Sequence, residues 1–75
     1  MTMSKLDRLV SMINQISLNL ASNGSEDQVS VLVAEHLNKF WSPPMKRLIL
    51  SQDLNSLGLS PISVKAISHL RSNDH

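Results

Sequence analysis

The segment that decides the fold is HLNKFWSPPMKR, residues 36–47. It contains the only Phe and the only Trp of the chain, and two of its three prolines. Because proline lacks a backbone N–H and clashes with the preceding helical turn, Pro43 and Pro44 must end a helix that arrives from the N-terminal side. A helix that ends on Phe40 and Trp41 carries a large apolar area at its tip. This segment, the aromatic corner, is therefore either the centre of a small core or a docking point for a partner.

Apolar residues on both sides of the aromatic corner recur at spacings of three and four, which predicts amphipathic helices and no strand. The predicted helices cover about residues 5–22, 26–41, 44–54 and 61–72. Ser4 and Ser25 are predicted helix caps, and Ser60 is a third cap because proline follows it at the first helical position. The chain is therefore expected to be a compact all-α domain of four helices.

The aromatic corner is predicted to separate the second and third helices. A residue that precedes proline avoids the helical region, so Ser42 and Pro43 are expected to be extended and Pro44 to open the third helix. The apolar stripe of the second helix consists of Val29, Leu32, Val33, His36, Leu37 and Phe40. Consecutive helical residues point about 100° apart. We therefore expect Phe40 to lie in the core and Trp41 to face outward as an interface anchor.

Length and composition narrow the class of protein. A chain of 75 residues suits one domain, expected over residues 4–72 with frayed ends at 1–3 and 73–75. Such a small core favours stabilisation by a partner chain, or a homodimer when the protein is isolated. The absence of cysteine excludes disulfides and thiolate ligands. No apolar run approaches the roughly 20 residues of a membrane span, so a cytoplasmic protein is expected.

The sequence gives little support for a catalytic role. His36, His69 and His75 lack a second ligand at metal-binding spacing, and the serines are expected at helix caps and surfaces. Two widely separated glycines exclude a phosphate-binding loop. The chain is therefore expected to be no enzyme and to bind neither metal nor cofactor by itself.

Two alternatives from other classes stay open. A small helical nucleic-acid-binding regulator would use Lys46, Arg47, Lys65 and Arg71, although a net charge of +1 argues against polyanion binding. The other alternative is a self-associating helical adaptor. The leading interpretation comes from a family resemblance.

The aromatic corner resembles the signature His-x-x-x-Phe-Trp-x-Pro-Arg-Met-Arg of the formate dehydrogenase delta subunit family. Upstream, residues 9–16, LVSMINQI, are similar to the family's Leu-Val-x-Met-x-Asn-Gln-Ile helix, and residues 59–70 resemble its closing helix. The resemblance implies a small accessory subunit, without a redox centre, of a soluble NAD-dependent formate dehydrogenase. It implies that the chain binds the large catalytic (alpha) subunit, which would carry bis-molybdopterin guanine dinucleotide, and stabilises it or assists its maturation and cofactor loading.

The resemblance also implies where a partner would bind. The candidate partner-binding residues are Asn14, Gln15, His36, Trp41, Pro43, Met45, Lys46 and Arg47. Phe40 and Pro44 are expected to shape the corner. Pro44 and Lys46 stand where the family has Arg, so a planar bidentate contact is lost at the first position and weakened at the second.

Overall fold

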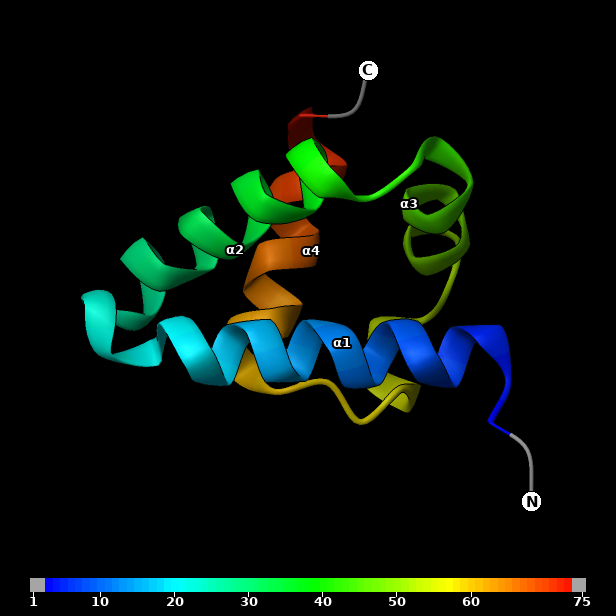
Figure 1. The fold of residues 1–75 in the computed structure, drawn as a ribbon, viewed down its shortest axis with the longest axis horizontal. Helices are drawn as coiled ribbons and strands as arrows, with labels where there is room; N and C mark the ends of the chain where they lie inside the picture. Colours follow the sequence, from blue (N-terminus) through cyan, green and yellow to red (C-terminus); the bar gives the residue numbers. More distant parts are fainter. Residues whose placement is uncertain (1–2, 74–75) are drawn as a thin grey trace.

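The chain forms four α-helices joined by short turns (Figure 1). They are α1 (Lys5–Leu20), α2 (Glu26–Phe40), α3 (Pro43–Leu50) and α4 (Pro61–Asn73), with single 3-10 turns at Ala21–Asn23 and Leu54–Ser56. The computed structural model describes residues 3–73, and within that range it contains no strand, so the all-α prediction is confirmed. Residues 1–2 and 74–75, part of the ends that were predicted to fray, lie outside the described residues.

The first two helices begin at reciprocal side-chain caps, as the sequence predicts. Ser4 Oγ accepts a hydrogen bond from the Asp7 backbone N–H at 3.1 Å, and Asp7 Oδ2 accepts one from the Ser4 N–H at 3.2 Å. Ser25 and Gln28 repeat the arrangement at 3.2 and 2.9 Å. Each pair satisfies two N–H groups that have no partner within the helix. The helix starts are therefore encoded locally.

Gly24 is required by the second of these caps. Its φ is 158°, and a Cβ added there would lie only 2.5 Å from Gln28 Oε1. The absence of a side chain at Gly24 lets the Gln28 amide fold back onto the Ser25 N–H. The short turn between α1 and α2 therefore needs glycine for a close approach as well as for its backbone conformation.

The third helix is shorter than predicted and begins one residue earlier. Pro43, not Pro44, is the first helical residue, while Ser42 is extended with φ −68° and ψ 157°. Neither proline interrupts the helix, because the first N–H groups of a helix have no intrahelical acceptor in any case. The expectation that Pro43 is extended was therefore wrong.

The end of α3 at Leu50, four residues before the predicted end, has a side-chain cause. Ser51 Oγ and Gln52 Nε2 both donate to the Leu48 carbonyl, at 2.9 and 3.2 Å. Arg71 Nη2, from α4, donates to the Leu50 carbonyl at 2.8 Å. These bonds satisfy carbonyls that a longer helix would have paired with its own N–H groups. A contact from a distant helix thus contributes to the stop.

The core lies where the four helices meet. Its fully or nearly buried apolar side chains are Leu9, Ile13, Val29, Val33, Ala34, Leu37, Trp41, Ile49, Ala66, Ile67 and Leu70. The most extensive packing is between α2 and α4. Ser30, Ala34 and Ala66 are buried along these two helices, and such small side chains allow two helix backbones to approach closely. The pair α2 and α4 is therefore the centre of the domain.

The two aromatic residues are placed in the opposite way to the prediction. Trp41 is buried, with 5% of its surface exposed, whereas Phe40 is 70% exposed. Leu32, which was also assigned to the inner stripe, is 40% exposed. The buried face of α2 is centred on Val33, Ala34 and Leu37 instead. The expectation that Phe40 is inside and Trp41 outside was wrong.

The reversal has two physical causes. Trp41 lies four residues after Leu37 and seven after Ala34, so the helical rotation of about 100° per residue places it on the Ala34 and Leu37 face, which is the face that α2 buries. In addition, α1 and α2 diverge from the turn that joins them, so α1 does not cover the C-terminal end of α2 (Figure 1). Phe40 therefore follows the helical stripe but extends beyond the helix that would bury it.

The placement predicts unequal effects of truncating the two aromatic residues. Trp41→Ala removes a core side chain and should lower the free energy of unfolding by about 3–5 kcal/mol, to be measured by urea denaturation monitored by circular dichroism. Phe40→Ala is the matched control and should change that free energy by less than about 1 kcal/mol, because its side chain is already in water. A larger loss for Phe40→Ala than for Trp41→Ala would contradict the assignment.

Candidate functional site

The exposed surface of the aromatic corner centres on Phe40. Its ring lies 4.7 Å from the His36 ring, centroid to centroid, with the two planes inclined by 46°. The two residues are one helical turn apart on α2, so the imidazole covers one side of the phenyl ring. Pro43 and Arg47 are exposed, and Met45 is half-buried against the core. The corner thus presents an aromatic pair beside the start of α3.

The other predicted contact residues of the corner are partly occupied within the chain. Lys46 Nζ donates to Asn38 Oδ1 at 3.3 Å, across the turn from α2 to α3. Trp41 is enclosed by the core and could meet a partner only after rearrangement. Of the predicted partner-binding residues at the corner, Pro43 and Arg47 are the two that are exposed, and the shaping residues Phe40 and Pro44 are exposed as well.

Asn14, a predicted partner contact on α1, joins α1 to the start of α4. Its Oδ1 accepts from the Ser60 N–H and from Ser63 Oγ, both at 2.9 Å, and its Nδ2 donates to the Gly58 carbonyl at 3.1 Å. The side-chain amide therefore uses its acceptor twice and its donor once inside the domain. This role explains an Asn at position 14 without a partner. Gln15, next to it, is exposed and donates to Asn19 at 3.1 Å.

Three serines are buried, although sequence reasoning placed the serines at caps and helix surfaces. Ser17 Oγ and Ser63 Oγ lie 2.8 Å apart between α1 and α4, and Ser30 Oγ donates to the Asp27 carbonyl at 2.7 Å. Every one of these hydroxyls has a hydrogen-bond partner, as burial requires. The general assignment of serines to the surface was wrong for these positions. Periodicity counts them as polar and so does not detect small residues at helix contacts.

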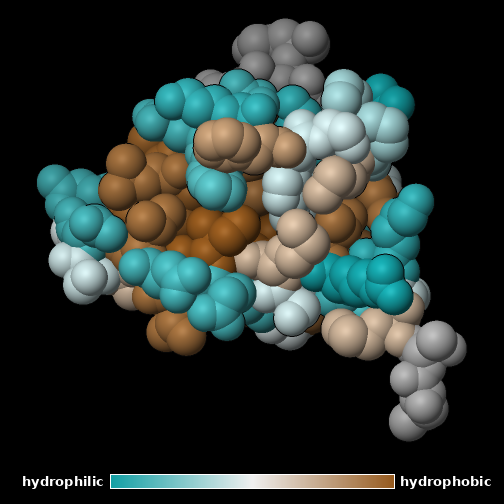
Figure 2. Space-filling model, in the orientation of Figure 1, coloured by the Kyte–Doolittle hydropathy of each residue, from teal (hydrophilic) through white to brown (hydrophobic). Residues whose placement is uncertain are grey.

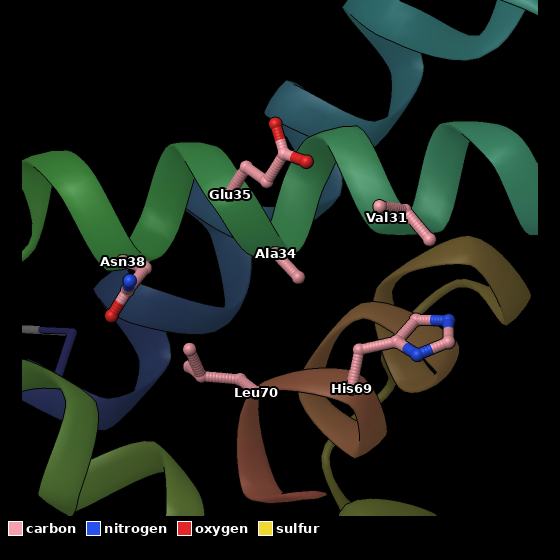
Figure 3. A pocket seen from close by; sticks show the side chains of 6 residues that line it. All are labelled: Val31, Ala34, Glu35, Asn38, His69 and Leu70. Atoms are coloured by element: carbon pink, nitrogen blue, oxygen red, sulfur yellow. The ribbon is translucent and has the colours of Figure 1, made fainter. Parts of the chain in front are cut away.

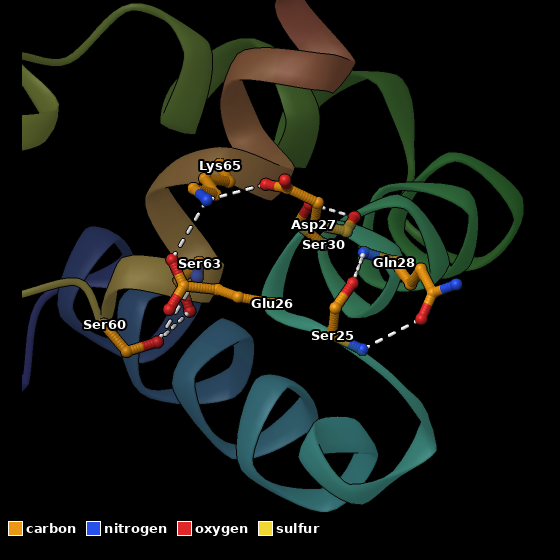
Figure 4. A network of polar contacts seen from close by, with 8 residues as sticks. All are labelled: Ser25, Glu26, Asp27, Gln28, Ser30, Ser60, Ser63 and Lys65. Carbon is orange, nitrogen blue, oxygen red and sulfur yellow. Dashed lines mark hydrogen bonds and ion pairs between the residues drawn. The ribbon is translucent and has the colours of Figure 1, made fainter.

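A cluster of charges ties the start of α2 to α4. Lys65 Nζ lies 2.6 Å from Asp27 Oδ1 and 3.1 Å from Glu26 Oε1 (Figure 4). The hydrogen bond from Lys65, together with its positive charge, lowers the pKa of the Asp27 carboxyl. The hydrogen bonds to Asp27 and Glu26 in turn raise the pKa of Lys65. Both carboxylates also lie in the first turn of α2, where the helix dipole favours negative charge.

The same contacts reduce the support for a nucleic-acid interface. Of the four cations that such an interface would use, Lys65 is paired with two carboxylates and Arg71 bonds the end of α3. Lys46 bonds Asn38, and Arg47 is the one side chain of the four with no hydrogen bond or ion pair in residues 3–73. Phosphate contacts need cations on a common face. Lys46, Lys65 and Arg71 instead link one helix to another within the domain.

A small cleft of about 180 Å³ lies between α2 and α4. Val31, Ala34, Glu35 and Asn38 line it from α2, and His69 and Leu70 line it from α4 (Figure 3). Glu35 and His69 are its two titratable side chains. In the range that the structure describes, no group of three or more His, Cys, Asp or Glu side chains could hold a metal ion. The cleft therefore offers no metal site.

Within residues 3–73, none of the helices combines the length and the apolar character that a membrane span needs.

Comparison with models of known protein families assigns the chain to one family. The sequence model of the NADH-dependent formate dehydrogenase delta subunit FdsD matches residues 8–67, which is most of the 75-residue sequence. The chain belongs to this family. The resemblance seen in the aromatic corner is thus confirmed over a region that includes α2, α3 and most of α1. No curated protein and no solved structure matches the chain significantly.

For this delta-subunit family member, the fold separates the two groups of predicted contact residues. The aromatic corner forms one end of α2 and the start of α3, whereas Asn14 bonds residues 58–63 before and within α4. No hydrogen bond links the two groups in the part of the chain that the structure describes. The predicted contact residues therefore do not form one hydrogen-bonded site.

The role of Asn14 can be tested by its removal. Asn14→Ala leaves the Ser60 N–H and the Gly58 carbonyl without their partner and should lower the free energy of unfolding by about 1–3 kcal/mol. The measurement is urea denaturation followed by circular dichroism. Gln15→Ala is the matched control on the same helix, and its effect should stay within about 0.5 kcal/mol because its side chain is exposed. Equal effects of the two variants would contradict a structural role for Asn14.

The Asp27–Lys65 pair predicts the direction of a pH effect. Because folding lowers the pKa of Asp27, its ionised carboxylate stabilises the fold above the ordinary pKa of aspartate, near about 4. That contribution is lost as the pH falls through the lowered pKa. The melting temperature of the wild type should therefore fall more than that of Asp27→Asn between about pH 6 and pH 2.5.

The control for this comparison is the same measurement at high salt concentration. The difference between the wild type and Asp27→Asn at pH 6 should shrink in about 1 M NaCl, because both partners are exposed and their attraction is screened. Parallel melting curves of the two proteins over the whole pH range would contradict the assigned pair.

Proposed function

We propose that this chain is a non-catalytic accessory subunit of a soluble, cytoplasmic NAD-dependent formate dehydrogenase. It binds the large catalytic (alpha) subunit and stabilises it or assists its maturation, including the loading of cofactor. The observation that carries the proposal is membership in the delta-subunit family over residues 8–67. The family name implies association with other formate dehydrogenase subunits, which supports the proposal.

The chemistry of the chain supports a binding role. It has no cysteine, so it offers no thiolate for an iron–sulfur cluster or for a covalent step. Its serine hydroxyls at positions 17, 30 and 63 are buried and hydrogen-bonded, which leaves them unable to attack a substrate. The proposal therefore assigns the bis-molybdopterin guanine dinucleotide cofactor and the reaction to the partner subunit, and none to this chain.

The distribution of apolar surface also supports binding to another chain. Phe40 and Leu18 are 70% and 69% exposed, and Leu32, Val31 and Met12 each expose about two fifths of their surface. Single exposed apolar residues are common on monomers, but aromatic residues, Phe among them, are enriched in protein interfaces relative to the rest of the surface. A domain this small gains stability by covering such residues with a partner.

The test is expression of the catalytic subunit with and without this chain. With the delta subunit present, we expect the two to co-purify through a tag on either one, and we expect a higher molybdenum or tungsten content of the catalytic subunit. Metal content is measured by mass spectrometry, and formate oxidation by NADH formation. The rate per loaded active site should be the same in both preparations, because the delta subunit adds no catalytic group.

The control is co-expression with Trp41→Ala, which should fail to support the catalytic subunit because the domain is destabilised. If the catalytic subunit has the same yield, metal content and activity without the delta subunit, and the two do not co-purify, the proposed function is wrong.

A further inference from the structure

The largest exposed aromatic surface of the chain lies on the side of α2 that faces away from α4. Asp27 bonds Lys65 of α4, and Ala34 lines a cleft with Leu70, so α4 runs along the Asp27 and Ala34 side of α2. Side chains four apart on a helix share a face. Leu32, His36 and Phe40 therefore form a continuous stripe on another side of α2.

A second apolar edge lies on α1, also on the side away from α4. Asn14 and Ser17 bond residues at the start of α4, which places α4 on their side of α1. Met12 lies about 160° around the helix from Asn14, because residues two apart differ by about 200°. Met12 is 43% exposed, and Ile16, one turn further along, is partly buried against the core. This flank of α1 is therefore directed away from α4.

The two edges border an open groove, here called the α1–α2 groove. Its apolar or aromatic edge residues are Met12, Ile16, Leu32, His36 and Phe40. Figure 2 shows hydrophobic surface gathered and hollowed between α1 and α2, with hydrophilic residues above and below it. In Figure 1 the two helices diverge toward the C-terminal end of α2, which is the end that carries Phe40.

The surroundings of the groove are basic. Lys39, next to Phe40, and Lys5, seven residues before Met12 on the same flank of α1, are both exposed. Residues 36–52 contain no Asp or Glu, and Arg47 is a further exposed cation there, whereas Lys46 bonds Asn38 beside the α2–α4 cleft. Glu35 is the acidic side chain on the α2 border. Cations therefore outnumber acidic groups around an apolar centre.

We propose that the α1–α2 groove, with Phe40 as its anchor, receives an acidic segment of the catalytic subunit that also carries apolar side chains. This inference rests on the proposed function, and it moves the predicted docking point from Trp41 to Phe40. An apolar side chain of the partner covers Phe40 and Leu32, while its carboxylates meet Lys39, Lys5 and Arg47. Complementary charge of this kind speeds association and selects the partner.

The charges also argue against a second copy of the chain as the occupant. An isologous dimer places the same patch of each protomer against the other. Lys39 and Arg47 of one copy would then lie against the equally basic patch of the other, without acidic residues between positions 36 and 52 to offset them. Like charges in contact oppose association. The groove is thus suited to a partner of opposite charge.

The test measures binding of the full-length chain to purified catalytic subunit that lacks it, by biolayer interferometry. Phe40→Ala should raise the dissociation constant about tenfold or more, as expected for loss of a central anchor. Leu18→Ala is the matched control: Leu18 is 69% exposed, as Phe40 is at 70%, but it borders a different pocket, so its effect should stay within about twofold. Circular dichroism verifies that both variants are folded.

Charge is tested separately. The double variant Lys39→Gln/Arg47→Gln should bind more weakly at low salt and show a smaller loss of affinity than the wild type as NaCl is raised. The proposed groove would be overturned if the wild type binds and Phe40→Ala binds with the same dissociation constant. It would also be overturned if Leu18→Ala weakens binding more than Phe40→Ala does. Either result would leave the proposed function intact. No binding by the wild type would instead overturn the proposed function.

Two further outcomes would also overturn the proposal. One is a dimer of the isolated chain that sedimentation shows to be lost in Phe40→Ala, which would make a second copy the occupant. The other is retention of a single-stranded oligonucleotide that depends on Phe40, which would favour nucleic acid.

Discussion

The turn at Trp41 is the constraint on which the rest of the domain depends. Pro43 and Pro44 cannot continue α2, and the backbone becomes extended at Trp41, whose indole packs into the core in register with Ala34 and Leu37. Trp41 is the largest side chain of that core, which also includes Leu37 from α2 and Ile49 from α3. Because the Trp fills this position, Phe40 is left at the surface on the other side of the same helix end. The end of α2 thus places one aromatic residue in the core and the other at the surface.

The remaining loops are held by polar side chains that cross between elements. Asn14 fixes the segment before α4, Arg71 closes the end of α3, and Lys65 links α4 to the start of α2. A core of this size buries little apolar surface, so polar contacts that order the connecting turns contribute a larger share of the stability of the domain. They also occupy the cations and amides that would otherwise be free to bind ligands. The proposed surface for a partner is the apolar edge of α1 and α2, and Lys39 and Arg47 are exposed cations of residues 36–52.

Much of the fold could be predicted because its signals are local. The capping pairs Ser4 with Asp7 and Ser25 with Gln28 mark their helices in sequence and in structure, and Ser60 caps α4 before Pro61. The end of α3 could not be predicted, since Arg71 lies about twenty residues away along the chain. The roles of Asn14, Ser17 and Ser63 were missed for the same reason. A polar residue on a helix shows no sign in sequence of the loop or helix that will meet it.

The sequence by itself determined the four helices, their caps, the corner at the two prolines and the family to which the chain belongs. Each of these depends on neighbours within a few positions or on a pattern of residue types. Only the tertiary structure decided which aromatic residue is buried. Periodicity gives the direction of a side chain around its own helix, but burial also requires another element in that direction. Because α1 diverges from α2 before Phe40, the stripe that begins in the core at Val29 ends in water.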